Sequence, residues 1–200
     1  MARTQALDYD KRRDAITQTA AKLYAAQGFL GTSVAQIAQA CQISKSLLYH
    51  YYPSKEDILF DVMDSHVQTL VEATREVESQ DLAAADKLGR LAQALMGHYV
   101  GAQAYQKVLL NELVNLPEDR RAVIVDHQRQ VLDVVDRLIV VLRPDLAKRR
   151  PDRRAMVMLF FGMLNWTHTW YDPSGPVAPA KFAAMASDTF LSGLQAGVGA

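Results

Sequence analysis

Hydrophobic residues recur every three or four positions along almost every segment longer than ten residues, and no alternating β-branched pattern persists. A spacing of three and four places apolar side chains on one face of a helix, whereas a strand requires alternation. The pattern therefore predicts an all-α fold of about nine helices. We expect a small N-terminal domain over residues 1–55 and a larger C-terminal domain over residues 56–200.

The pattern and the stop signals delimit the first and fourth helices. A first helix is expected over Asp10–Gln27, because Gly28 accepts the left-handed conformation that ends many helices. A later proline, Pro53, cannot continue a helix, and Ser54 can cap the next one. A long fourth helix is therefore predicted to run from there toward residue 79.

Two short helices lie between these boundaries. Thr32 or Ser33 can cap one that ends at Ala40, and the other begins at Ser44. Only the three residues 41–43 separate them, and a turn of this length joins short helices at a steep angle. The N-terminal domain is therefore predicted to be a three-helix helix-turn-helix domain.

Breaks in the pattern divide the remaining chain into five more helices. The breaks fall at residues 80–82, 101–104, 115–118, 143–145 and 171–179. The two longest helices are expected over residues 119–142 and 151–171, and a final one over about 180–195.

Charge distinguishes the two parts of the chain, although the net charge of the whole is zero. Residues 1–55 carry seven Lys or Arg against three Asp, and the remainder carries 15 basic and 19 acidic residues, so the parts are +4 and −4. A basic module favours a polyanionic partner, although such a charge also describes an ordinary solvated surface.

The stretch from Gly28 to Leu59, GFLGTSVAQIAQACQISKSLLYHYYPSKEDIL, resembles the DNA-binding domain of the TetR family of bacterial regulators. Its matching features are the pairs and runs 28–29, 32–34, 37–38 and 43–45, and above all Leu48-Tyr49-His50-Tyr51-Tyr52-Pro53-Ser54-Lys55. The resemblance covers residues 12–60. It implies a homodimeric transcriptional repressor that binds operator DNA and is released from it by a small hydrophobic or acyl-CoA-type effector.

The helix that begins at Ser44 is the expected recognition helix, because its exposed face offers short donors and one cation to a major groove. We expect hydroxyl groups, backbone amides and lysines near the helix starts to contact the DNA phosphates. Tyr49 and Tyr52 have the alternative of lying in the core, and Lys11, Arg12 and Arg13 either add DNA contacts or only keep the chain soluble. The predicted DNA-binding residues are Thr32, Ser33, Ser44, Lys45, Ser46, Leu47, Tyr49, His50, Tyr51 and Lys55.

Two residues depart from the family pattern. Gln42 occupies the turn position that is usually glycine, so a left-handed backbone there is strained. Leu47 stands where a small polar residue is common, so an apolar contact to a thymine methyl group replaces a hydroxyl contact. Base specificity therefore cannot be copied from relatives.

A single module of this size reads few base pairs, so we expect a two-fold dimer on a near-palindromic site. The last two long helices are the expected interface, with small residues that permit close approach; burial within one monomer is the alternative. The predicted interface residues are Phe160, Met163, Leu164, Thr167, Phe182, Ala186, Phe190 and Gly193.

Large apolar groups with sparse polar ones between the fifth and eighth helices are typical of a small-molecule pocket, and equally of an ordinary core. The predicted effector residues are His98, Tyr99, Tyr105, Asn111, Glu112, Trp166 and Trp170. The segment 165–179, NWTHTWYDPSGPVAP, is similar to the tail of family members that respond to acyl-CoA thioesters. That similarity implies phosphate attraction by Lys148, Arg149, Arg150, Arg153 and Arg154, which otherwise form a solvated turn.

Other classes of protein find little support. The five histidines show no metal-ligand spacing, Cys41 has no paired ligand, and no phosphate-binding glycine loop follows a strand, so we expect no cofactor, no metal and no enzyme. No apolar run approaches the roughly 20 residues that span a bilayer. One cysteine and no secretory signal favour the cytoplasm. An architectural DNA-binding protein without an effector is the remaining alternative.

Overall fold

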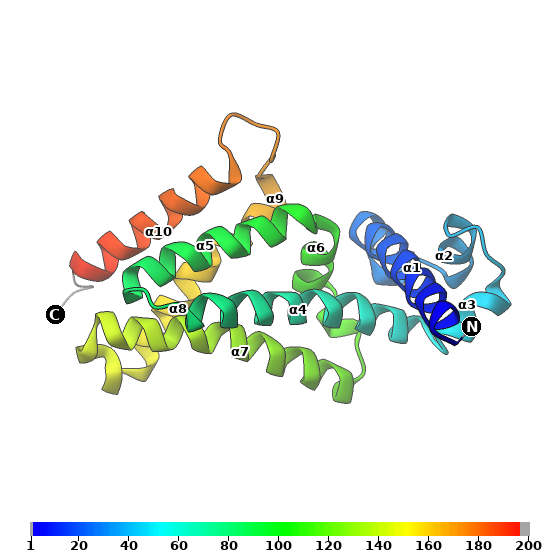
Figure 1. Cartoon of the computed structure of the whole chain (residues 1–200), viewed down its shortest axis with the longest axis horizontal. Coiled ribbons are helices and arrows are strands. Elements are labelled where there is room, and N and C mark those ends of the chain that lie inside the picture. The colour runs from blue at the N-terminus through cyan, green and yellow to red at the C-terminus, as the bar shows by residue number, and fades with distance from the viewer. Residues whose placement is uncertain (1, 197–200) are drawn as a thin grey trace. The chain divides into compact units, whose positions relative to one another are not determined.

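The computed structural model describes residues 2–196 and is helical throughout, with no strand in this range (Figure 1). The all-α prediction is confirmed. The chain forms two compact units, one of Met1–Val67 with Ala104–Val125 and one of Gln68–Gln103 with Asp126–Ala200. The helices in chain order are α1 (Ala2–Gly31), α2 (Val34–Ala40), α3 (Lys45–Tyr51), α4 (Lys55–Ser79), α5 (Ala84–Gly101), α6 (Gln103–Asn111), α7 (Glu118–Leu142), α8 (Arg150–Asn165), α9 (Thr167–Trp170) and α10 (Pro179–Ala196).

Helix α1 is longer than the pattern predicted. It begins eight residues before Asp10, because residues 2–10 contain neither proline nor glycine and hold several good helix formers. It also continues past the expected stop: Gly28 has φ 78° and ψ 162°, a conformation that is essentially restricted to glycine, and one further turn follows the kink. The predicted signal at Gly28 therefore marks a bend instead of the end of the helix.

The core of the first unit is built by α1 to α4. Ile16, Ala20 and Tyr24 form the buried stripe of α1, at the spacing that the sequence predicted. Ile37 on α2 and Leu48 on α3 are fully buried. Helix α2 packs against both α1 and α3, so the two short helices are held on a longer one.

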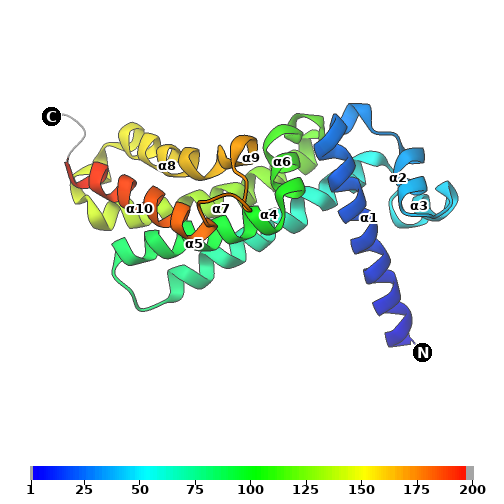
Figure 2. The same cartoon turned by 90° about the horizontal axis from the view of Figure 1, so that it is seen from above.

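The second unit is organised around α5 and α10, which pack along each other's length (Figure 2). Small residues on α10, Ala183 and Ser187, are buried and permit a close approach, with the Ser187 hydroxyl beside Gly89 of α5. Helix α8 packs on α10 through the Phe160 and Phe190 rings, whose centroids lie 5.3 Å apart. Helices α5, α8 and α10 thus pack against one another.

The helix expected over residues 151–171 is divided in two. Helix α8 ends at Asn165, and the single turn α9 follows. Side chains here bind backbone carbonyls: the Thr167 hydroxyl donates to Leu164 O (2.5 Å), and the Thr169 hydroxyl donates to Trp166 O (2.8 Å). Such local bonds compete with the regular helical ladder, which explains the break.

Candidate DNA-binding surface, effector residues and family

Helix α3 begins at the residue that the sequence indicated. Ser44 is its N-cap, with an extended backbone (φ −72°, ψ 152°), and its hydroxyl oxygen accepts the amide hydrogen of Leu47 at 3.0 Å. Leu48 is fully buried and fastens the helix to the core, and Tyr52 ends the helix with its amide on Leu48 O. A capped helix of two turns is therefore held by one face only.

The other face of α3 is exposed and polar. Tyr49 is 47% exposed, so it is a surface residue and not a core residue. Tyr51 is half-buried and stacks on Tyr9 of α1, with ring centroids 4.7 Å apart. Leu47 is also half-buried, whereas the fully exposed members of this face are Ser44, Lys45, Ser46 and His50.

The turn between α2 and α3 has the left-handed geometry that is usual for glycine at this position, with Gln42 in its place. Gln42 has φ 55°, the one positive φ among the described non-glycine residues. Its amide donates to Gln39 O (3.0 Å), and the amide of Ile43 donates to Ala38 O (3.0 Å). These two bonds form a Schellman cap on α2, in which the left-handed position usually belongs to glycine.

Of the two candidate caps for α2, Ser33 is the one used. Its hydroxyl oxygen accepts the Gln36 amide (3.2 Å), and the Gln36 side chain accepts the Ser33 amide (2.7 Å), so a capping box is complete. Ser33 is exposed. Thr32 is buried, and its hydroxyl donates to Gly28 O at 2.8 Å. Because Thr32 is buried, it contributes to the surface only by supporting neighbouring residues.

The sequence predicted a phosphate contact for Lys55, but the structure turns its ammonium group inward. Nζ donates to Phe29 O (2.9 Å) and Thr32 O (3.0 Å), and it lies 4.0 Å from the centroid of the Phe29 ring. Both carbonyls follow the bend at Gly28 within four residues, and a lysine at the start of α4 donates to them. Its role in this structure is to hold the joint between α1 and α2.

A polar network at the end of α3 joins residues far apart in the sequence, so the local pattern does not predict it. The Arg13 guanidinium donates to the Tyr52 hydroxyl (Nε, 3.1 Å) and to Asp61 on α4 (Nη2 to Oδ1, 3.0 Å), and the Tyr52 hydroxyl donates to Asp61. The hydrogen bond with Tyr52 leads the causes that raise the pKa of Arg13. Burial, followed by the bond with Asp61, raises the pKa of the Tyr52 hydroxyl. These hydrogen bonds fix the Arg13 side chain against Tyr52 and Asp61.

The predicted effector residues are divided between the two units. In the first, burial raises the pKa of the half-buried Tyr105 hydroxyl, and its hydrogen bond with Thr17 has the opposite effect. Asn111 is exposed, and its amide donates to Lys107 O (2.7 Å). Glu112 accepts from the Asn115 amide (2.7 Å). None of these contacts by itself defines a ligand site.

In the second unit, Tyr99 on α5 is buried and His98 is half-buried. The two tryptophans lie at the surface, with Trp166 65% exposed and Trp170 57% exposed. Trp170 contacts the Phe182 ring, at a centroid distance of 5.6 Å. The predicted set therefore mixes core and surface positions.

Most of the predicted interface residues belong to the core of the monomer. Five of the eight are buried within one chain, Met163 and Phe182 are half-buried, and Gly193 is exposed. The helical period places a different row of α8 side chains on the outside, because residues four, seven and eleven positions after Ala155 share its face. The five buried residues are Phe160, Leu164, Thr167, Ala186 and Phe190.

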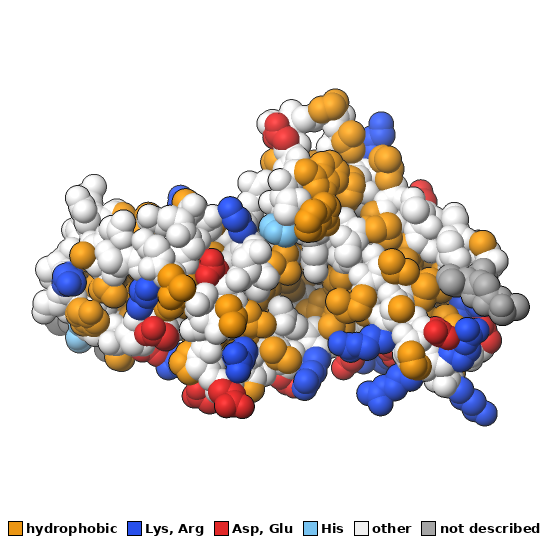
Figure 3. Space-filling model, turned by 180° about the vertical axis from the view of Figure 1, so that it is seen from behind, with side chains coloured by type: hydrophobic (Ala, Val, Ile, Leu, Met, Phe, Trp, Pro, Cys, Tyr) orange, Lys and Arg blue, Asp and Glu red, His pale blue; other side chains and the backbone are white. Residues whose placement is uncertain are grey.

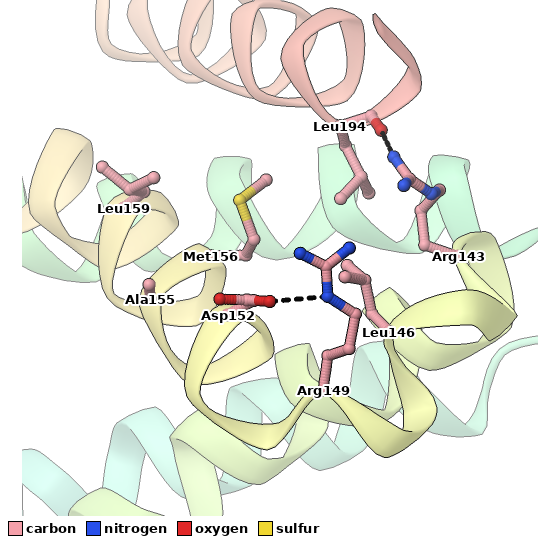
Figure 4. A pocket seen from close by; sticks show the side chains of 8 residues that line it. All are labelled: Arg143, Leu146, Arg149, Asp152, Ala155, Met156, Leu159 and Leu194. Atoms are coloured by element: carbon pink, nitrogen blue, oxygen red, sulfur yellow. Dashed lines mark hydrogen bonds and ion pairs between the residues drawn. The ribbon is translucent and has the colours of Figure 1, made fainter. Parts of the chain in front are cut away.

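A cavity of about 340 Å³ opens in the second unit beside the start of α8 (Figure 4). Met156, Leu146 and Leu194 give it apolar walls, and the Arg149 guanidinium donates to Asp152 across its rim (2.7 Å). It is lined by Arg143, Leu146, Arg149, Asp152, Ala155, Met156, Leu159 and Leu194.

The basic cluster near this cavity is partly tied in place. Arg153 donates to Asp136 (2.7 Å) and to Ala147 O (2.7 Å), and Arg149 is paired as described above. Lys148, Arg150 and Arg154 are exposed. The cluster therefore presents three solvated cations and two anchored ones.

No group of three or more His, Cys, Asp or Glu side chains among residues 2–196 is arranged to hold a metal ion. No helix of the described chain has the length and apolarity that crossing a membrane requires.

The chain belongs to the TetR family. Residues 16–62 match the family of bacterial regulatory proteins of the tetR type, and residues 81–194 match the tetracyclin repressor-like C-terminal domain. The resemblance inferred from the sequence is confirmed, and with it a DNA-binding transcriptional regulator instead of an enzyme.

Three relatives illustrate the likeness. A TetR-family transcriptional regulator from Bordetella parapertussis 12822 is 37% identical, with a TM-score of 0.88 over 94% of this chain and 98% of that chain. The HTH-type transcriptional regulator HbdR of Aromatoleum sp. (strain CIB) is 28% identical over 80% of this chain and 69% of its own length. The fold also matches AibR in complex with isovaleryl coenzyme A and operator DNA, at 24% identity and TM-score 0.79 over 89% of this chain and 97% of that chain.

Proposed function

We propose that this regulator reads a near-palindromic operator as a homodimer, with α3 as the recognition helix, and that a hydrophobic or acyl-CoA-type effector releases it from DNA. The observation that carries the proposal is the polar, exposed face of α3 above a fully buried Leu48. A capped helix anchored on one side is what insertion into a major groove requires. DNA as the target also favours the cytoplasm as its location.

Different residues of this surface have different proposed roles. Lys45, Tyr49 and His50 are exposed and suited to base edges or phosphates, and Leu47 to a thymine methyl group. Ser33 and Tyr51 are suited to phosphates. Thr32 and Lys55 support the surface from behind, through the bonds at the joint of α1 and α2.

Binding to labelled operator DNA, selected by genomic footprinting, tests this proposal. We expect Lys45→Ala and Tyr49→Ala to weaken binding by about tenfold each, because a lost specific contact costs about 1–3 kcal/mol. Lys107→Ala is the matched control, since Lys107 is an exposed lysine on α6. Equal affinity for the wild type, the α3 variants and the control would refute α3 as the reading helix.

The dimer surface that we propose is the outer face of α8 with the adjoining side of α10. Ala155, Leu159, Gly162 and Trp166 are exposed and lie along one face of α8 at helical spacing. Hydrophobic side chains gather on this side of the molecule (Figure 3). Met185 on α10 is 53% exposed. An apolar face of this kind on two neighbouring helices fits a bundle formed with a second copy.

The effector proposal rests on the second unit. Its cavity combines apolar walls with two lining cations, the guanidinium groups of Arg143 and Arg149. That combination suits an apolar group joined to an anion, as in an acyl-CoA. A relative of the same fold is described in complex with isovaleryl coenzyme A.

A panel of acyl-CoA thioesters, with free coenzyme A as the control, tests the effector class. An effector that prefers the released state must lower DNA affinity by its differential affinity for the two states. We expect at least one thioester to raise the melting temperature and release the operator. If every thioester leaves both quantities at the value seen with free coenzyme A, the acyl-CoA proposal fails.

We propose that the DNA-binding residues lie within 1–55 and the effector and dimer residues within 56–200. The two family matches, over 16–62 and 81–194, fall largely on either side of that boundary and support it.

A further inference from the structure

The first turn of α7 is fastened to the first turns of α4 by one side chain. The Arg120 guanidinium is ion-paired with Asp57, and it also lies over the Phe60 ring, 4.8 Å from its centroid. The side chains of Arg120 and Asp57 are 36% and 17% exposed. Because the pair is partly shielded from water, its attraction exceeds that of a fully exposed ion pair.

Asp57 has a second task at the same place. The Ser54 hydroxyl donates to Asp57 Oδ2 (2.6 Å), and the Ser54 oxygen accepts the Asp57 amide (3.1 Å). These bonds cap the start of α4. Arg120 binds the other oxygen of the Asp57 carboxylate, Oδ1. It therefore holds the side chain that organises the first turn of α4.

The same turn of α4 also contacts the segment that joins α1 to α2. Lys55, between the two capping residues, binds the carbonyls of Phe29 and Thr32 at the joint between α1 and α2. The residue after Thr32 is Ser33, which caps α2. A shift of this turn must therefore either stretch the lysine bonds or carry the start of α2 with it.

We propose that Arg120 is a positioning residue for DNA binding: through Asp57 and Lys55 it fixes the start of α2, and so the orientation of α2 and α3, without touching DNA. The inference rests on the proposed DNA-reading role of α3. Through this contact, the position of α7 affects the orientation of α2 and α3.

Operator affinity of Arg120→Ala, compared with Arg121→Ala, tests the proposal. Both variants remove one positive charge from neighbouring positions of α7, so long-range attraction to DNA falls equally in the two. We expect Arg120→Ala to bind about tenfold more weakly than the wild type, Arg121→Ala to stay within twofold, and Arg120→Lys to recover part of the loss. Equal affinity of Arg120→Ala and Arg121→Ala would overturn the proposal.

Salt dependence separates positioning from direct contact. Loss of a phosphate contact makes the slope of log K against log salt shallower by about 0.9. We expect Arg120→Ala to keep the slope of Arg121→Ala, and a slope shallower by about one would make Arg120 a DNA contact instead. Asp57→Asn leaves an oxygen for Ser54 but removes the charge that Arg120 binds. If the two residues act through the same contact, the double variant Arg120→Ala/Asp57→Asn should lose no more operator affinity than either single variant. Additive losses would contradict the shared route.

Amide hydrogen exchange without DNA gives an independent readout. We expect Arg120→Ala to speed exchange at the hydrogen-bonded amides of Gln36 and Ile37 in α2 and of Asp57 in α4, while α5 and α10 keep their wild-type rates. Acceleration throughout the chain would mean general destabilisation and would overturn a positioning role. If the wild type itself binds no operator, the proposed function fails; normal wild-type binding with an unaffected Arg120→Ala rejects only this inference.

Discussion

The strained turn between α2 and α3 gives a prediction whose magnitude follows from the structure. Gln42 has φ 55°, and a left-handed backbone costs a residue with a Cβ about 1–2 kcal/mol. Gln42→Gly removes that cost but adds about 0.5–1 kcal/mol of chain entropy to be lost on folding. The mid-range values of the two effects, about 1.5 and about 0.75 kcal/mol, leave the variant more stable than the wild type by about 0.75 kcal/mol.

Urea unfolding and thermal unfolding at one fixed protein concentration measure this difference. A fixed concentration is needed because association shifts the apparent stability. For a chain of this size the expected rise in Tm is about 1–4 °C. Gln42→Ala is the control, since it removes the exposed side chain but keeps the Cβ, and it should not be stabilised. A glycine variant that is no more stable than the alanine variant would refute the argument from backbone strain.

Three further substitutions test other parts of the structure. Ser33→Ala leaves the Gln36 amide without its cap and should lower the free energy of unfolding by about 1 kcal/mol, measured by urea unfolding; an unchanged midpoint would contradict the capping role. Tyr52→Phe removes the hydroxyl that binds Asp61 and should lower the free energy of unfolding by about 1–2 kcal/mol. An unchanged free energy in the same assay would refute a stabilising role for this hydrogen bond. Leu159→Glu puts a charge on the proposed dimer face and should yield monomers in sedimentation equilibrium, whereas an intact dimer would exclude this face.

The sequence could predict the helix-turn-helix because its signals are local. Ser44 as an N-cap, Gly28 as a special backbone position and the buried Leu48 each depend on residues within one or two turns. The same is true of the capping box at Ser33. Such signals survive in a single sequence, since the partner residues lie three or four positions apart.

Contacts between distant segments could not be predicted in this way. Arg13 binds Asp61, which lies 48 positions away in the sequence, and Lys55 binds the Phe29 carbonyl, which lies 26 positions away. Because the local pattern does not show these partners, both side chains were expected to face DNA or solvent. Nothing in the local pattern distinguishes a cation on a phosphate from one on a carbonyl.

The dimer face shows a different limit. Helix α8 has apolar residues on two sides, with Phe160 and Leu164 buried and Leu159 and Trp166 exposed. A helical period identifies these two rows but does not decide which row a monomer buries. The tertiary packing of α8 on α10, through Phe160 and Phe190, makes that choice.

The central claim is that two copies of α3 enter the major groove of one operator. Methylation protection by dimethyl sulfate tests it directly, because the reagent modifies guanine N7 in the major groove and adenine N3 in the minor groove. The account predicts two symmetric blocks of protected guanines, one helical turn of about 10 base pairs apart or a multiple of it, and about tenfold more protein is needed to produce them with Tyr49→Ala. Protection of adenines alone, or of a single unpaired block, would contradict it.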